Sequence, residues 1–160
     1  MPDEKKLSAY INKSKLIPNS NSEKKIRIAI LGGFTLNGLE ETLRVKCDEK
    51  KIQCTTYVSG YNQYNQEILD EKSQLYKFSP DITFLIIDSR NALGEFFLNP
   101  YSISVQERKL FVENKSNEII NLAKELVKKS KSKLVISNFN IPSYSPIGIS
   151  EVKEEFGLHD

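Results

Sequence analysis

Short apolar runs alternate with polar, glycine-containing segments along this chain of 160 residues. Residues 26–31 hold five apolar positions out of six. That run is too continuous for a strand with one solvated face, and it predicts a central strand of a parallel sheet. Residues 82–87 and 134–137 predict two more strands, while residues 52–58 alternate between apolar and polar positions. Such alternation is typical of a strand with one dry face, as at a sheet edge.

Apolar residues at helical spacing lie between these strands. Leu36, Leu39, Leu43 and Cys47 follow the first strand, residues 104–130 predict a long helix, and residues 151–156 predict a last one. The resulting order is strand, helix, strand, loop, strand, helix, strand, helix. Because such crossovers are right-handed, we expect an α/β fold: a three-layer α/β/α sandwich around a doubly wound parallel sheet of order 2-1-3-4.

The predicted α/β domain covers residues 25–160. Residues 1–24 are polar and predict an N-terminal arm or short amphipathic helix, with a Pro- and Ser-containing loop at residues 18–22. This arm could pack on the domain or extend away from it, and the sequence leaves both arrangements open.

Composition excludes several classes of function. The net charge is only +2, from 23 basic and 21 acidic side chains, so no global field attracts nucleic acid or an acidic membrane. Cys47 and Cys54 do not have metal-ligand spacing and predict small core residues in a reducing compartment. There is no membrane-spanning run and no signal peptide. We therefore expect a cytoplasmic protein with no metal site.

Two polar loops follow the two most apolar strands. In a doubly wound sheet, ligands bind outside the carboxyl ends of the strands. Backbone N–H groups at a helix N-terminus together with an arginine suit a small anionic ligand. The alternative is that Thr35, Asp88 and Asn91 only cap helices. The predicted binding residues are Gly32, Gly33, Thr35, Asn37, Asp88, Arg90 and Asn91, flanked by Asn138 after the fourth strand.

Three common sites at such loops do not fit the sequence. Residues 33–38 have the glycine spacing of a P-loop, but Leu39 and Glu40 stand where that motif needs Lys and Ser or Thr. The dinucleotide-binding Gly-x-Gly-x-x-Gly is absent. A phospho-acceptor role for Asp88 would require an acidic pair after the first strand, where this chain has Gly32 and Gly33.

The segment 61–66 contains the triplet Tyr-Asn-Gln twice. Exposed tyrosines supply rigid amphipathic contact surface, so Tyr61 and Tyr64 are candidate binding residues. Alternatively, both rings only cover the end of the sheet.

Several motifs together resemble one family. They are Ile30-Leu31-Gly32-Gly33-Phe34-Thr35, Gly60-Tyr61-Asn62-Gln63-Tyr64, Leu69-Asp70, Ser73-x-Leu75-Tyr76-x-Phe78-x-Pro80-Asp81, Ile87-Asp88 and Asn138-Phe139-x-Ile141-Pro142-x-Tyr144-Ser145-Pro146-x-Gly148. This set resembles the N-terminal region of FkbH-like (HAD-IIIC) proteins over residues 26–149. That region is similar to SGNH (GDSL-type) hydrolases, which implies an SGNH-like α/β sandwich.

The resemblance also implies a larger context. Family members join this region to a C-terminal HAD-type phosphatase or transferase domain, linked to moving a glyceryl unit onto an acyl carrier protein. The Asp-x-Asp-x-Thr motif of that domain is absent from these 160 residues, so the chain is expected to be truncated at its C-terminus. Its implied partners are an acyl carrier protein and its own HAD domain. Mg²⁺ is expected only for the HAD domain, and no cofactor for this chain.

The hydrolase motifs themselves are mostly lost. The Gly-Asp-Ser nucleophile block falls on residues 32–34, which places Phe34 at the serine position, and the oxyanion block has Arg90 in place of Asn. The Asp-x-x-His block has no counterpart, since the sole histidine is His159. Thr35 and Ser89 remain the catalytic candidates. The prediction is a binding or positioning module without hydrolase activity; the alternatives are an active esterase or acyltransferase with a displaced Thr or Ser nucleophile, and a plain protein-interaction scaffold.

Overall fold

The structure is a computed structural model that describes residues 6–17, 23–140 and 142–157. The strands are β1 Lys24–Gly32, β2 Ile52–Val58, β3 Ile82–Ile86 and β4 Lys133–Ile136. The α-helices are α1 Leu7–Leu16, α2 Leu39–Asp48, α3 Tyr64–Leu69, α4 Gln74–Phe78, α5 Ser89–Leu93, α6 Glu95–Leu98 and α7 Val105–Lys129. The 3-10 turns are η1 Pro100–Ser102 and η2 Gly148–Lys153.

All strand pairs in the sheet are parallel, and the strand order is β2-β1-β3-β4. Ile28 of β1 lies opposite Thr56 of β2 and Ile82 of β3, so β1 is the central strand of its half. Residues 28–32 are buried, whereas no residue of β2 is. The predicted order 2-1-3-4 and the predicted edge position of residues 52–58 are confirmed.

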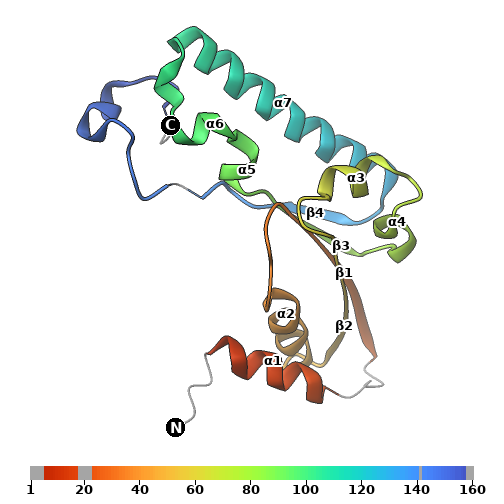
Figure 1. Cartoon of the computed structure of the whole chain (residues 1–160). Coiled ribbons are helices and arrows are strands. Elements are labelled where there is room, and N and C mark those ends of the chain that lie inside the picture. Colours follow the sequence, from red (N-terminus) through yellow and green to blue (C-terminus); the bar gives the residue numbers. More distant parts are fainter. Residues whose placement is uncertain (1–5, 18–22, 141, 158–160) are drawn as a thin grey trace.

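Helices cover both faces of the sheet, as the predicted three-layer sandwich requires (Figure 1). Helices α1 and α2 lie on one face, and α3, α4 and α7 lie on the other (Figure 1). Helix α1 falls within the predicted N-terminal arm and packs against α2, where the ammonium of Lys46 lies 5.3 Å from the ring centre of Tyr10. The arm's helical part is therefore docked on the domain. The loop predicted at residues 18–22 lies outside the described residues.

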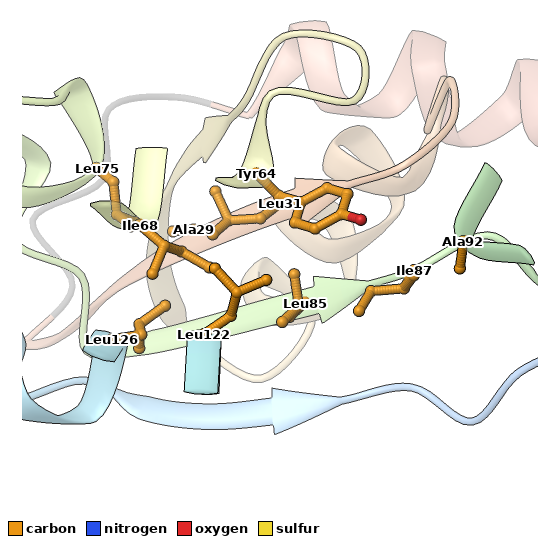
Figure 2. Close-up of a cluster of buried hydrophobic side chains, with 10 residues drawn as sticks. All are labelled: Ala29, Leu31, Tyr64, Ile68, Leu75, Leu85, Ile87, Ala92, Leu122 and Leu126. Atoms are coloured by element: carbon orange, nitrogen blue, oxygen red, sulfur yellow. The ribbon is translucent and has the colours of Figure 1, made fainter. Parts of the chain in front are cut away.

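The core lies between the sheet and the α3–α7 layer (Figure 2). Successive side chains of a strand point to opposite faces, so Ala29 and Leu31 share one face of β1 and meet Leu85 of β3. The helices contribute Ile68 and Leu126, both fully buried. Burying a leucine or isoleucine side chain stabilises a fold by about 1.5–3 kcal/mol, so this cluster stabilises the packing of the α3–α7 layer on the sheet.

Helix α7 matches the predicted helix at residues 104–130. Its N-cap Ser104 accepts from the backbone N–H of Glu107, and the carboxylate of Glu107 accepts from the backbone N–H of Ser104 at 2.8 Å. This capping box lowers the pKa of Glu107, because the bonds from Ser104 stabilise the charged carboxylate.

The last predicted helix, residues 151–156, is wrong. The chain instead forms the 3-10 turn η2 and then becomes extended at Glu154, and Phe156 has a positive φ of 53°. The physical reason is a tertiary contact: buried Arg108 of α7 donates to the carboxylate of Glu154 at 2.8 Å and to the carbonyl of Glu155. Those bonds hold the segment in a shape that a helix would not allow.

The two cysteines are free and partly buried. Cys47 lies on α2 and Cys54 on the neighbouring β2. Burial, with a smaller contribution from Cys47, raises the pKa of the Cys54 thiol to about 12. A thiol held in its neutral form fits the predicted role of small core residue.

Candidate functional site

A pocket of about 220 Å³ opens where β1 and β2 end. The loop that follows β1 forms most of its wall, and the first turn of α2, the end of β2 and the segment after β2 form the rest. This is the carboxyl edge of the parallel sheet, the place at which doubly wound folds bind ligands. The lining residues are Gly32, Phe34, Thr35, Leu36, Asn37, Gly38, Glu40, Glu41, Val58, Ser59 and Tyr61.

Backbone hydrogen bonds shape the floor of the pocket. The N–H of Gly32 donates to the hydroxyl of Ser59 at 3.4 Å, and the carbonyl of Gly32 accepts from Asn62 at 3.2 Å. Gly33 is bonded to β3 through its N–H and the carbonyl of Ile86, at 3.0 Å. A Cβ on Gly33 would lie only 3.1 Å from the backbone nitrogen of Asp88. The glycine pair therefore lets the loops after β1 and β3 approach each other closely.

The helix that borders the pocket begins without a side-chain cap. Its N-cap is Gly38, with a φ of 85°, so Thr35 does not have the capping role considered above. Thr35 and Asn37 are exposed and line the pocket. Their hydroxyl and amide groups are thus available to a ligand.

The polar residues of the second loop are mostly engaged in structure. Asp88 is the N-cap of α5 and accepts from the backbone N–H of Asn91 at 3.0 Å. The side-chain amide of Asn91 donates to the carbonyl of Gly33 and to the hydroxyl of Tyr61, the latter at 3.3 Å. Asn91 therefore joins the second loop to the pocket wall, although it does not line the pocket.

The side chains of Arg90 and Ser89 do not line the pocket, and each has different neighbours. The guanidinium carbon of Arg90 lies 5.4 Å from the ring centre of Phe97, and Arg90 does not line the pocket. Ser89 is buried and donates its hydroxyl to the carbonyl of Asn140 at 3.0 Å. Asn138 is exposed beyond the end of β4.

The two tyrosines of segment 61–66 have different environments. Tyr61 is 64% exposed and lines the pocket, whereas Tyr64 is 8% exposed and belongs to the core cluster (Figure 2). Burial raises the pKa of the Tyr64 phenol. Of the two predicted contact residues, only Tyr61 has its side chain at the candidate site.

The pocket carries negative rather than positive side chains. Glu40 and Glu41 lie in the first turn of α2, where carboxylates are favoured by the helix dipole. The hydroxyl of Thr56 donates to a carboxylate oxygen of Glu40 at 2.6 Å. Among the residues that the structure describes, no lysine or arginine lines the pocket. The walls are therefore suited to hydroxyl and amide donors on a ligand, and an anionic group would have to lie toward Arg90.

Sequence reasoning missed Ser59, Glu40 and Glu41 as pocket residues. Ser59 follows the edge strand β2, so the carboxyl-end rule that selected the loops after β1 and β3 would have found it. Glu40 and Glu41 follow directly from the register of α2, once the helix start is placed at Gly38.

Two classes of feature are absent from the part of the chain that the structure describes. Residues 6–17, 23–140 and 142–157 hold no group of three or more His, Cys, Asp or Glu side chains able to bind a metal ion. In the same ranges, no helix combines the length and the apolar character needed to cross a membrane.

A solved structure shares this architecture. It is the N-terminal part of a Bacteroides fragilis protein that contains a phosphatase domain and was solved in complex with Mg. Its TM-score is 0.69 at 16% sequence identity, and the match covers 94% of this chain but 38% of that one. The likeness supports the fold alone. The chain spans well under half the length of that relative.

Sequence comparison gives the family. No curated protein sequence matches the chain. Residues 27–144, which include both strand-end loops and β4, match the family described as FkbH, N-terminal domain. The chain therefore belongs to the FkbH N-terminal domain family.

Proposed function

We propose that this domain binds and positions a small polar group in the pocket at the carboxyl ends of β1 and β2. We also propose that it does not hydrolyse esters itself. The observation that carries the proposal is the chemistry of the pocket wall. It presents Thr35, Asn37 and Tyr61 to solvent, but it has Phe34 where the hydrolase pattern places its nucleophile. A phenyl ring cannot attack a carbonyl, whereas hydroxyl and amide groups can hold a ligand in place.

The second catalytic candidate supports the same proposal. A nucleophile needs a base within hydrogen-bond reach. The Ser89 hydroxyl is buried and donates to a backbone carbonyl, which is not a base. His159 lies outside the described residues.

The proposed context is a longer protein with a HAD-type phosphatase or transferase domain. In that protein the domain would serve glyceryl or acyl transfer to an acyl carrier protein, and Mg²⁺ would belong to the HAD domain. Two observations support this context: membership of the FkbH N-terminal domain family, and the likeness to a structure whose chain contains a phosphatase domain. Arg90 is the residue we propose for an anionic part of the ligand, since its guanidinium is exposed beside the loops.

The second candidate function is an esterase that uses Thr35. The favouring observation is that Thr35 is exposed in the same pocket as the carboxylates of Glu40 and Glu41, either of which could accept a proton.

Turnover of p-nitrophenyl acetate decides between the two. We expect no rate above buffer for the unmodified chain and the same result for Thr35→Ala. A rate that Thr35→Ala abolishes, while Ser89→Ala does not, would replace the binding proposal with the esterase.

Ligand binding needs its own measurement. We expect 3-phosphoglycerate, used as a probe, to shift the amide NMR signals of residues 32–38 and 90–91. Loss of an arginine contact to an anion costs about 1.5–3 kcal/mol, so Arg90→Ala should weaken this binding by roughly tenfold or more. Lys77→Ala, an exposed control on α4, should leave it unchanged. Signals that move only elsewhere on the domain would contradict the proposed site.

A further inference from the structure

A second concave surface lies on the other side of the molecule's sheet, between α7 and the edge strand β4. It is a shallow groove of about 450 Å³. Its lining residues are Ile119, Ile120, Ala123, Lys124, Val127 and Lys128 of α7 and Ile136 of β4. We call it the α7–β4 groove. None of these residues belongs to the pocket described above.

The groove exposes apolar side chains that a helix on a protein surface normally buries. Ile120 is 47% exposed, Val127 is 58% exposed, and Ile136 is 42% exposed. The core-facing side of α7 is already occupied, since Leu122 and Leu126 are buried against the sheet. Helix α7 therefore has a second apolar stripe beside the one that the fold uses. These side chains line one groove, so together they form a single apolar surface that a partner could cover.

The rim of the groove is basic and its charges are not neutralised within the described chain. Lys115 and Lys129, on the other side of α7, pair with acidic side chains. Lys124 and Lys128 form no ion pair with any described residue. A partner that brings carboxylates to this rim would supply the missing opposite charges.

The shape of the groove favours a helix over a strand as its occupant. Six of its seven lining residues come from α7, and they run from Ile119 to Lys128, about 14 Å at 1.5 Å per residue. That length accommodates between two and three turns of a helix lying along α7. The edge of β4 has only four residues, which is too short for a strand to gain much by adding to it.

We propose that the α7–β4 groove docks an acidic amphipathic helix of a partner protein. The apolar face of that helix would cover Ile120, Val127 and Ile136, and its carboxylates would meet Lys124 and Lys128. The proposal goes beyond the small-ligand site, because it uses a different face and different residues.

The test uses the whole chain and a synthetic peptide as probe. The peptide is an 18-residue helix with leucines at i, i+3, i+4 and i+7 spacing and glutamates on both flanks; a control peptide has lysines in place of the glutamates. We expect the acidic peptide to shift the amide signals of residues 119–128 and 136, and the basic peptide to shift none. Raising the salt concentration should weaken the acidic complex.

Variants of the chain separate charge from apolar contact. Lys124→Glu with Lys128→Glu should weaken binding of the acidic peptide by at least tenfold and allow the basic peptide to bind. Val127→Glu should abolish binding without loss of helicity by circular dichroism, because Val127 is exposed. Lys109→Glu, on the same helix outside the groove, is the matched control and should have no effect.

Three results would overturn the proposal. The first is that the acidic peptide does not bind, or shifts signals elsewhere on the domain. The second is that both peptides bind equally. The third is that light scattering shows the chain to be a dimer, which Val127→Glu dissociates. The last result would assign the groove to a second copy of this chain.

Discussion

The loops after β1 and β3 both carry polar side chains, but these side chains have different roles in the structure. In the loop after β1, Thr35 and Asn37 are exposed in a pocket. In the loop after β3, Asp88 caps α5 and Ser89 is buried against the carbonyl of Asn140. A polar side chain at a strand end is therefore evidence for a site only when it is not already hydrogen-bonded to nearby backbone groups.

The difference follows from how each helix begins. The N-cap of helix α2 is Gly38, which has a positive φ and no side chain that could accept from the first N–H groups of the helix. The side chains of Thr35 and Asn37, which precede it, are therefore not used as caps and remain exposed. Helix α5 starts directly after β3 and takes its cap from Asp88. Four substitutions in the two loops test this contrast and should differ in how strongly they perturb the domain.

Gly33→Ala should have the largest effect, because the added Cβ would lie 3.1 Å from the backbone nitrogen of Asp88 and force the two loops apart. Overpacking of this kind costs about 1–3 kcal/mol. For a chain of this size, 1 kcal/mol lowers the melting temperature by about 2–4 °C. Differential scanning calorimetry measures the shift. Gly94→Ala is not a suitable control, because the positive φ of 57° at Gly94 would itself strain an alanine. Ala123→Gly is not suitable either, because glycine weakens a helix. An unchanged melting temperature for Gly33→Ala would show that the loops are not in close contact.

Asn91→Ala should come second. It removes the amide that donates to the carbonyl of Gly33 and to the hydroxyl of Tyr61. The net loss of such a hydrogen bond costs about 0.5–1.5 kcal/mol. Urea denaturation gives the change in the free energy of unfolding, and NMR should show altered signals for Gly33 and Tyr61. Tyr61→Phe removes only the weaker contact and serves as the control; equal effects of the two variants would contradict the assigned role of the Gly33 carbonyl.

Asp88→Ala should destabilise the domain by about 1 kcal/mol, the usual loss when an N-cap is removed. Asp88→Asn is the matched variant, because its side-chain oxygen can still accept from the N–H of Asn91. We expect urea denaturation to give nearly the same stability for Asp88→Asn as for the unmodified chain. If both variants were equally unstable, the charge of Asp88 and not its capping bond would be what stabilises α5.

Thr35→Ala should have the smallest effect on stability, within about 0.5 kcal/mol, as is usual for exposed positions away from caps and cores. Thr35 is exposed and caps no helix. The same variant should nevertheless weaken binding of any probe that shifts the signals of residues 32–38. A loss of stability as large as that of Asp88→Ala would show that Thr35 is structural, and the contrast between the two loops would then fail.

The strands, their order and the edge of the sheet where a site would lie could be predicted from the amino-acid sequence. Continuous apolar runs at residues 26–31 and 82–87 require cover on both faces, and the alternation at residues 52–58 requires an edge position. These patterns depend only on which positions are buried, and the apolar or polar character of each side chain in the sequence indicates that. The motifs also indicated the family, because all but the last four residues of the final motif lie within residues 27–144.

Which polar residues are available to a ligand could not be predicted in this way, because it depends on contacts that form in the folded structure. Tyr61 and Tyr64 begin two identical Tyr-Asn-Gln triplets, yet Tyr61 lines the pocket and Tyr64 lies in the core. Residues 151–156 have no α-helix because buried Arg108, distant in sequence, bonds to Glu154 and Glu155. Ser89 is structural through the carbonyl of Asn140, which lies 51 residues away in the sequence, whereas the cap that Asp88 forms with Asn91 is local and was among the predicted alternatives. Hydrogen bonds and burial across elements depend on distances between segments far apart in the chain, and periodicity within one segment holds no information about them.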